Sequence, residues 1–253
     1  MEKSETATDQ RKLFCVGMAK TGTHSVAAMF DGRLKAAHEP CSRELLSLIL
    51  TLHEGQTDRG QVRLAIAKLI KLHDLDVNSS QLNVYILDHL LELFPGSRFL
   101  LTIRPPREWL DSLIDHCINY EAAEQWKEFR DMRFGGKARR AGREEKPLQR
   151  HGLYSLEGYF SYWRWHNERV LTTVPKNRLK IVQTSEIGRS AVDIARFGGF
   201  SDESLLIEKT HEFKATKKHY VLSEIDPDYL NAQISEYCGP LADENFSKPT
   251  CLL

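Results

Sequence analysis

The sequence predicts an α/β protein in which helices flank a central parallel β-sheet. Short apolar segments alternate along the chain with longer segments in which apolar residues recur every three or four positions. The first pattern is typical of buried strands and the second of amphipathic helices. Because parallel neighbours in a sheet are joined by crossover connections, this repeated alternation favours a parallel sheet covered by helices. The chain has 253 residues, of which 41% are hydrophobic, so it can bury such a core.

The first half of the chain contains six expected elements, separated by glycine, proline or polar residues. Strands are expected at 12–18 and 34–37, and helices from Thr23 onward, at 41–53, at 61–73 and at 84–94. Pro95 and Gly96 end the last of these helices. Two strand-to-helix connections are therefore expected before residue 61.

The second half repeats this order. A strand is expected at 98–103, and Pro105 and Pro106 then open a helix, since proline fits the first turn of a helix. A long helix is expected at 153–171 and a last strand at 178–182.

We expect one domain over residues 1–253, with a disordered tail at 1–11. Residues 135–150 are polar, contain glycine and lack a helical or strand period, which predicts a loop rather than a domain boundary. Together with the residues on either side of it, this segment is expected to form a mobile basic loop at 130–152.

The balance of charges restricts the function classes. The 35 Lys and Arg residues equal the 35 Asp and Glu residues in number, which argues against a nucleic-acid or membrane-surface protein. Five cysteines lie far apart without a C-x-x-C pair, which argues against a zinc site and a disulfide-linked secreted fold. No signal peptide or membrane-spanning segment is expected, because the first dozen residues are polar and the apolar runs are short. No prenylation motif is expected, because Cys251 is third from the end and not fourth. We expect a cytoplasmic protein.

The most informative residues, 17–25, read GMAKTGTHS and stand between the first expected strand and helix. A turn in this place presents successive backbone N–H groups and the positive end of a helix dipole to one point. Lys20 adds a full charge, and Thr21, Thr23 and Ser25 add hydroxyl groups. The segment therefore predicts an anion-binding site.

The order of residues in this turn differs from that of a nucleotide triphosphatase. The triphosphatase loop has its lysine after the last glycine and next to a hydroxyl that holds magnesium, whereas Lys20 here precedes Thr21 and Gly22. The order K-T-G-T-x-S instead resembles the 5′-phosphosulfate loop of the sulfotransferases that use 3′-phosphoadenosine 5′-phosphosulfate (PAPS). The resemblance is to the cytosolic type, and in particular to bacterial enzymes that act on small molecules.

A second match lies about eighty residues later. Sulfotransferases carry an arginine after a strand and a serine eight positions on, within the next helix, and both bind the 3′-phosphate of the donor. Arg104 and Ser112 fit this spacing. A guanidinium group suits the task, because it forms directed, charge-assisted hydrogen bonds to phosphate. The resemblance covers residues 13–112. It departs from the family pattern at His24, which leaves the anion site intact but changes its contacts near the sulfonate, and at Pro105 and Pro106, to which no role is transferred.

The resemblance implies a P-loop-like sulfotransferase architecture and a donor site made of both segments. The residues expected to contact the donor are Lys20, Thr21, Gly22, Thr23, His24, Ser25, Arg104 and Ser112. It also implies transfer of a sulfonate to a hydroxyl or amine, without an obligatory metal, and with release of adenosine 3′,5′-bisphosphate. Lys20 would stabilise negative charge on the leaving phosphate oxygen.

The acceptor's proton requires a general base near the sulfonate. Glu39 is the first candidate and His38 the second, since both follow the second expected strand, whose end borders the donor site in an open parallel sheet. Asp76 is the third candidate, because other family members draw their base from the corresponding strand.

The acceptor itself is less closely defined than the donor. Residues 130–150 hold eight basic and three acidic residues, which favours either a solvated loop or a lid over a small, anionic acceptor. Nearby aromatic residues are either pocket walls or core: Tyr154, Tyr159, Phe160 and Trp163. Lys214, Lys217 and Lys218 loosely resemble the basic C-terminal segment of the family.

Two other functions stay open on the sequence. One is a non-catalytic module that binds an adenosine bisphosphate, and the other is a P-loop kinase, which the position of Lys20 disfavours. Nucleic-acid binding is disfavoured, because aromatic residues are not interleaved with the basic ones at 130–150. The oligomeric state is left undetermined.

Overall fold

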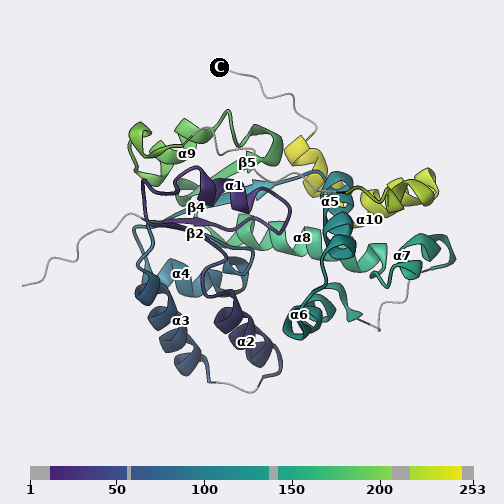
Figure 1. Ribbon diagram of the computed structural model, residues 1–253, viewed down its shortest axis with the longest axis horizontal. Coiled ribbons are helices and arrows are strands. Elements are labelled where there is room, and N and C mark those ends of the chain that lie inside the picture. Colours follow the sequence, from purple (N-terminus) through teal and green to yellow (C-terminus); the bar gives the residue numbers. More distant parts are fainter. Residues whose placement is uncertain (1–11, 56–57, 137–141, 207–216, 247–253) are drawn as a thin grey trace, which may run out of the picture. The chain divides into compact units, whose positions relative to one another are not determined.

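The computed structural model describes residues 12–55, 58–136, 142–206 and 217–246 (Figure 1). The expected tail at 1–11 lies outside these ranges. The chain divides into two compact units, a first unit of residues 1–102 and 172–213 and a second unit of residues 103–171 and 214–253. The expectation that the whole chain acts as one domain stays a prediction.

The first unit is built on a five-stranded sheet in the order β2-β3-β1-β4-β5. Its strands are β1 (Leu13–Cys15), β2 (Ala36–His38), β3 (Val77–Ser79), β4 (Arg98–Ile103) and β5 (Leu179–Gln183). β1 pairs in parallel with β3 and β4, and β2 pairs in parallel with β3. The predicted α/β class with a parallel sheet and flanking helices is therefore confirmed.

The alternation of side chains along β1 explains how helices cover this sheet. Leu13 and Cys15 point to one face and belong to a buried cluster that includes Val26 and Ile194. Phe14 points to the other face and stacks on Phe99, with ring centroids 5.6 Å apart. The helices of this unit are α1 (Thr23–Ala28), α2 (Ser42–His53), α3 (Arg59–His73), α4 (Leu87–Leu93) and α9 (Ala191–Gly198).

Short 3-10 helices complete the first unit: η1 (Asn83–Ile86), η4 (Lys176–Arg178), η5 (Thr184–Glu186) and η6 (Asp202–Ser204). The register of the sheet matters most for the site. Cys15, His38 and Ser79 are aligned across β1, β2 and β3, so the residues that follow them lie at one edge of the sheet.

The second unit is helical and has its own core. Its elements are α5 (Pro106–Asn119), α6 (Glu124–Phe134), η3 (Arg143–Glu145), α7 (Lys146–Arg150), α8 (Leu156–Thr173), η8 (Val221–Glu224) and α10 (Pro227–Phe246). The two largest side chains of its core, Trp109 and Trp163, are almost fully buried. The Arg133 guanidinium lies 4.4 Å from the ring centroid of Phe129 and 4.9 Å from that of Phe134.

The described part of the basic segment at 130–152 is largely helical, where the sequence predicted a loop. Residues 130–134 are the last part of α6, and residues 143–150 form η3 and α7. Tertiary contacts explain the difference: the buried Glu145 carboxylate accepts hydrogen bonds from the Leu156 backbone N–H and the Tyr229 hydroxyl. Burial raises the pKa of Glu145. Residues 137–141 lie outside the described ranges.

Two further helices, α9 and α10, had no counterpart among the predicted elements. α10 contains Pro240 in its interior, a residue that normally disfavours helix. No helix in the described ranges is both long and apolar enough to cross a membrane.

Candidate functional site

The turn between β1 and α1 has a backbone that only particular residues tolerate. Lys20 has a φ of 68° and Gly22 a φ of 92°. A Cβ atom on Gly22 would lie 2.3 Å from Ile187 Cδ1, and a Cβ atom on Gly17 would lie 1.9 Å from Thr102 Oγ1. The two glycines are therefore required by close packing, and at Gly22 by backbone conformation too.

Thr21 braces this turn from inside. Its fully buried hydroxyl donates to the Met18 carbonyl oxygen over 2.8 Å and lies 2.8 Å from Thr102 Oγ1. Because the Thr21 hydroxyl has only one proton, Thr102 is the donor in the second bond. The Thr184 hydroxyl in turn donates to the Thr21 carbonyl oxygen over 2.9 Å. The sequence pattern singled out Thr21 but neither threonine partner, since these follow it by 81 and 163 positions.

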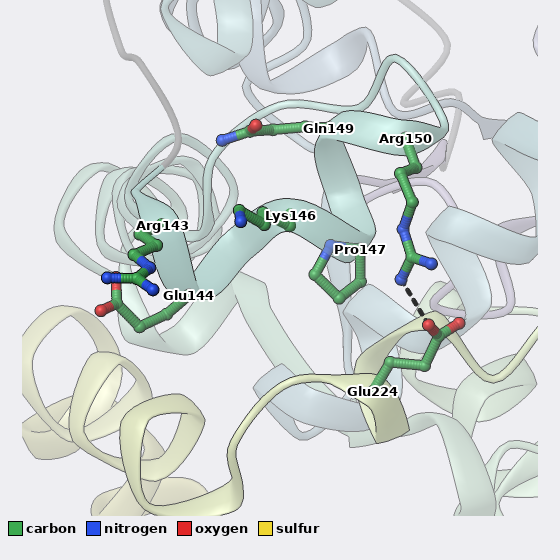
Figure 2. A pocket seen from close by; sticks show the side chains of 7 residues that line it. All are labelled: Arg143, Glu144, Lys146, Pro147, Gln149, Arg150 and Glu224. Atoms are coloured by element: carbon green, nitrogen blue, oxygen red, sulfur yellow. Dashed lines mark hydrogen bonds and ion pairs between the residues drawn. The ribbon is translucent and has the colours of Figure 1, made fainter.

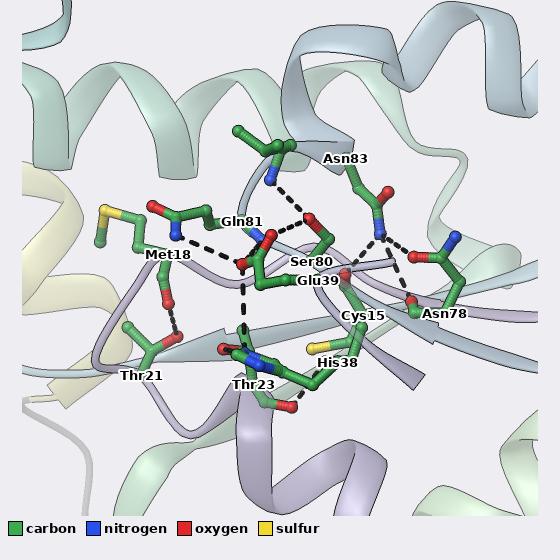
Figure 3. Close-up of polar contacts among 12 residues, drawn as sticks. Cys15, Met18, Thr21, Thr23, His38, Glu39, Asn78, Ser80, Gln81 and Asn83 are labelled. Atoms are coloured by element: carbon green, nitrogen blue, oxygen red, sulfur yellow. Dashed lines mark hydrogen bonds and ion pairs between the residues drawn. The ribbon is translucent and has the colours of Figure 1, made fainter. Parts of the chain in front are cut away.

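Most of the remaining predicted residues of the turn lie nearer the surface than Thr21. Lys20, Gly22, His24 and Ser25 are half-buried, whereas Thr23 is buried. Thr23 begins α1, and its hydroxyl lies 3.2 Å from His38 Nε2 (Figure 3). This contact joins the turn to the carboxyl end of β2.

The environment of the His38 imidazole disfavours its protonated, charged form. Burial and the nearby His24 lower the pKa of His38 to about 4. The centroids of the two imidazole rings are 5.0 Å apart. His38 is therefore neutral at physiological pH, and its lowered pKa makes it a weaker proton acceptor than an ordinary histidine.

Glu39 is held by donors at the carboxyl end of β3. The Ser80 hydroxyl donates to Glu39 Oε2 over 2.5 Å, and the backbone and side-chain N–H groups of Gln81 donate to Glu39 Oε1 over 3.0 and 3.3 Å (Figure 3). His38 Nε2 lies 4.0 Å from Glu39 Oε1. The Glu39 side chain is 16% exposed. The structure thus brings Glu39 and His38 together, next to Thr23.

Asp76 lies at the opposite end of the sheet from these residues. It precedes β3, and its carboxylate accepts a hydrogen bond from the Lys35 backbone N–H over 3.0 Å. The residues of β3 separate Asp76 from Ser80, about 13 Å along an extended chain. The structure does not bring Asp76 to the edge of the sheet that carries the turn, so Asp76 is too far from the turn to act as the base.

Arg104 and Ser112 belong to the second unit. The Arg104 carbonyl oxygen accepts a hydrogen bond from Trp163 Nε1 over 3.1 Å, and Arg104 Nε lies 3.8 Å from Glu108 Oε2. Ser112 is half-buried in α5. Along the chain Arg104 follows Thr102, which contacts Thr21, by two residues.

The basic segment after residue 216 is attached to α5. The Asp115 carboxylate accepts the His219 backbone N–H over 2.8 Å, and Asn119 Nδ2 donates to the Lys217 carbonyl oxygen over 2.9 Å. Lys218 Nζ lies 3.6 Å from Asp111 Oδ2. Lys214 lies outside the described residues.

The aromatic residues near the basic segment belong mostly to the core. Tyr159, Phe160 and Trp163 are fully buried. Tyr154 is half-buried and donates to Asp131 over 2.7 Å. An open hollow in the same unit is lined by α7, its flanks and Glu224, and Figure 2 shows Arg150 pointing toward Glu224, with which it forms an ion pair. In the described ranges no three His, Cys, Asp or Glu residues are grouped so that they could hold a metal ion.

A parallel sheet whose first strand leads through a glycine-containing turn into a helix is the architecture of α/β proteins that bind phosphate groups. Within that class, residues 12–188 match the family model described as the sulfotransferase domain. The chain belongs to this sulfotransferase family.

The fold also resembles those of solved sulfotransferase structures, the first of which supports the fold assignment. A sulfotransferase from Alicyclobacillus acidocaldarius matches with a TM-score of 0.50 and 16% identity, covering 94% of this chain and 96% of that one. A sulfotransferase from Mycobacterium avium matches with a TM-score of 0.49 and 13% identity, covering 90% of this chain and 76% of that one. The comparison with curated proteins finds no match.

Proposed function

We propose that this chain transfers a sulfonate group from PAPS to a hydroxyl or amine of a small-molecule acceptor. The observation that carries the proposal is the shared sheet edge. The turn with Lys20 follows β1, and His38 and Glu39 lie at the end of β2 and directly after it, joined to the turn through Thr23. A site for an anionic donor and a proton acceptor are therefore neighbours.

The residues of the turn suit a phosphosulfate group. Gly17 and Gly22 let the turn pack closely against Thr102 and Ile187, which fixes its shape, and Lys20 supplies a positive charge. Backbone N–H groups of residues 22–25 would hold the 5′-phosphate, with the hydroxyl groups of Thr23 and Ser25 and the His24 ring beside them. The Thr21 backbone N–H is not among them, because it donates to the Met18 carbonyl oxygen over 3.2 Å. Thr21 would contribute mainly by fixing the shape of the turn, because its hydroxyl is used internally.

The 3′-phosphate of the donor would be bound by Arg104 and Ser112. The support is their spacing around the start of α5, together with the two-residue separation of Arg104 from Thr102. A guanidinium group recognises phosphate by charge-assisted hydrogen bonds, and the serine hydroxyl would add one more.

The proposed reaction is an in-line displacement at sulfur. The acceptor oxygen or nitrogen forms a bond to sulfur as the bond from sulfur to the 5′-phosphate oxygen breaks. Lys20 stabilises the negative charge that develops on that leaving oxygen. Glu39 takes the acceptor's proton, and the neutral His38 is the alternative base. The proposal needs no metal. An anionic acceptor and a cytoplasmic location stay predictions.

A thermal-shift comparison tests the donor site. Adenosine 3′,5′-bisphosphate should raise the melting temperature of the protein, because a ligand that binds the folded state stabilises it by mass action. Lys20→Ala should lose most of this shift, whereas Lys68→Ala, on α3, is the control and should keep it. A shift with Mg-ATP alone would contradict the proposal and favour a kinase.

Turnover separates an enzyme from a binding module. With ³⁵S-labelled PAPS and a metabolite extract as the source of acceptors, the protein should form labelled products, and Lys20→Ala should lower the rate by a factor on the order of 10². Binding of the bisphosphate without any labelled product would instead indicate a non-catalytic module.

A further inference from the structure

The residues that end β3 contact both parts of the proposed site. We call Ser79, Ser80 and Gln81 the β3 bracket. The Ser79 hydroxyl donates to the Thr23 carbonyl oxygen over 2.6 Å, and the Ser79 carbonyl oxygen accepts the Glu39 backbone N–H over 2.8 Å. One buried residue thus connects the start of α1 with the backbone of Glu39.

The next two residues of the β3 bracket bind the Glu39 carboxylate itself. The Ser80 hydroxyl accepts the Leu82 backbone N–H over 3.0 Å. It donates to Glu39 Oε2, as Figure 3 shows. The Leu82 bond occupies a lone pair of the Ser80 oxygen, so the single hydroxyl proton is directed at the carboxylate. Gln81 donates to the other carboxylate oxygen from its backbone and its side chain.

Glu39 also has a backbone conformation that non-glycine residues rarely adopt, with a φ of 51°. Such a conformation persists only where surrounding contacts determine it, and the Ser79 and Ser80 bonds supply such contacts here. The side chain and the backbone of Glu39 are therefore held by one short segment of a neighbouring strand.

We infer that Ser80 and Gln81 are positioning residues for the transfer reaction, which hold the Glu39 carboxylate in one orientation beside the turn. This inference rests on the proposed role of Glu39 as the base. Three donors favour the charged form of a carboxylate over its protonated form. They also remove rotamer freedom that the side chain would otherwise lose at each turnover.

Removing these two side chains leaves the pairing of the strands in place, although Ser80→Ala also deprives the Leu82 backbone N–H of its acceptor. Ser80 is bound to β1 through its backbone N–H, which donates to the Cys15 carbonyl oxygen over 3.2 Å and is retained in Ser80→Ala. Gln81→Ala likewise keeps the backbone donor to Glu39 Oε1 and loses only the longer, 3.3 Å side-chain bond. The two variants therefore form a graded pair.

The test measures donor hydrolysis and the titration of Glu39 in the full chain. PAPS is the probe, with water as the acceptor, and release of adenosine 3′,5′-bisphosphate gives kcat and KM. Proteins labelled with ¹³C at the glutamate carboxyl carbons report by NMR the pH midpoint of the Glu39 resonance, which Glu39→Gln identifies by removing it. Ser47→Ala, on the exposed face of α2, is the matched control.

Ser80→Ala should lower kcat about tenfold and leave the KM for PAPS nearly unchanged, and Gln81→Ala should lower kcat by about two- to threefold. In both variants the Glu39 resonance should titrate at higher pH than in the unaltered protein, more so for Ser80→Ala. A purely structural role would leave kcat unchanged even where the midpoint moves, so the two readouts must change together. If Ser80→Ala does not fold, Gln81→Ala alone decides the question.

The outcomes separate this inference from the proposed function. If Glu39→Gln hydrolyses PAPS at the unaltered rate, the role of Glu39 as the base is wrong. If Glu39→Gln is inactive while Ser80→Ala and Gln81→Ala keep both kcat and the Glu39 midpoint, the proposed function survives and the positioning role is overturned.

Discussion

Two residues on which the proposed chemistry depends share an uncommon backbone conformation. Among the described residues, the non-glycine residues with a positive φ include Lys20 and Glu39, the proposed leaving-group stabiliser and the proposed base. Each such conformation costs about 1 kcal/mol or more. Thr21 and the β3 bracket supply contacts that hold these two residues in place. These contacts therefore offset the conformational free energy of two residues whose side chains the proposed reaction needs in a fixed orientation.

His38 gives a prediction about stability and pH. Its pKa is lowered to about 4 in the folded protein, so between pH 4 and about 6.5 the unfolded chain binds more protons than the folded one. The stabilising effect of a neutral His38 is complete above pH 6.5 and is lost as the pH falls toward 4. Allowing for solvent screening of this partly exposed ring, the loss is about 2 kcal/mol.

Urea unfolding at pH 4.5 and 7.5 measures this effect. The difference in unfolding free energy between the two pH values should shrink in His38→Asn and remain in His73→Asn, which changes an exposed histidine of α3. An equal pH dependence in His38→Asn and the unaltered protein would contradict the lowered pKa.

At the scale of elements, α5 carries more than the Ser112 that the sequence motif identified. Asp111, Asp115 and Asn119 recur every four residues on this helix and contact Lys217, Lys218 and His219. His219 Nε2 lies 2.9 Å from Asn119 Oδ1. One polar stripe of α5 therefore holds a basic segment that is about a hundred positions away in the sequence.

Removing the central contact of this stripe should loosen the basic segment. Asp115 is only 1% exposed, so Asp115→Ala leaves the His219 N–H without its acceptor and should cost about 1–3 kcal/mol. Asp115→Asn keeps an acceptor oxygen and should cost less. Chemical denaturation gives the two free energies, and amide hydrogen exchange at residues 217–222 should accelerate more in Asp115→Ala. Unchanged exchange in that variant would show that Asp115 does not anchor the segment.

At the scale of the whole molecule, the chain has no net charge, so recognition of a doubly phosphorylated nucleotide must come from local groups. The proposal places Lys20 and Arg104 on different phosphates of one donor.

Nucleotide discrimination tests this division of roles. Arg104→Ala should weaken binding of adenosine 3′,5′-bisphosphate about 10- to 100-fold, because charge-assisted hydrogen bonds to the 3′-phosphate are lost. Binding of adenosine 5′-monophosphate, which lacks that phosphate, should change little. Isothermal titration calorimetry measures both affinities, with Arg63→Ala on α3 as the control. An equal loss for both nucleotides would contradict the assignment of Arg104 to the 3′-phosphate.

Local sequence patterns predicted much of the fold correctly. The apolar run at 98–103 is β4 as predicted, and Pro106 begins α5, because strand burial and helix starts depend on neighbouring residues. The sequence predicts a loop at 135–150, whereas residues 143–150 form η3 and α7. The prediction fails there because the contacts that stabilise these helices come from Leu156 and Tyr229. Periodicity carries no information about partners so far along the chain.

By itself the sequence determined the α/β order of elements, the glycine-containing turn with Lys20 and the placement of Glu39 and His38 at the end of the second strand. Only the tertiary structure decided that Thr21 faces inward to Thr102, that Asp76 lies at the far end of the sheet and that Ser80 and Gln81 bind Glu39. The reason is physical. Helix and strand formation depends largely on residues a few positions apart, whereas a hydrogen bond between side chains forty or eighty positions apart exists only once the strands are paired in register.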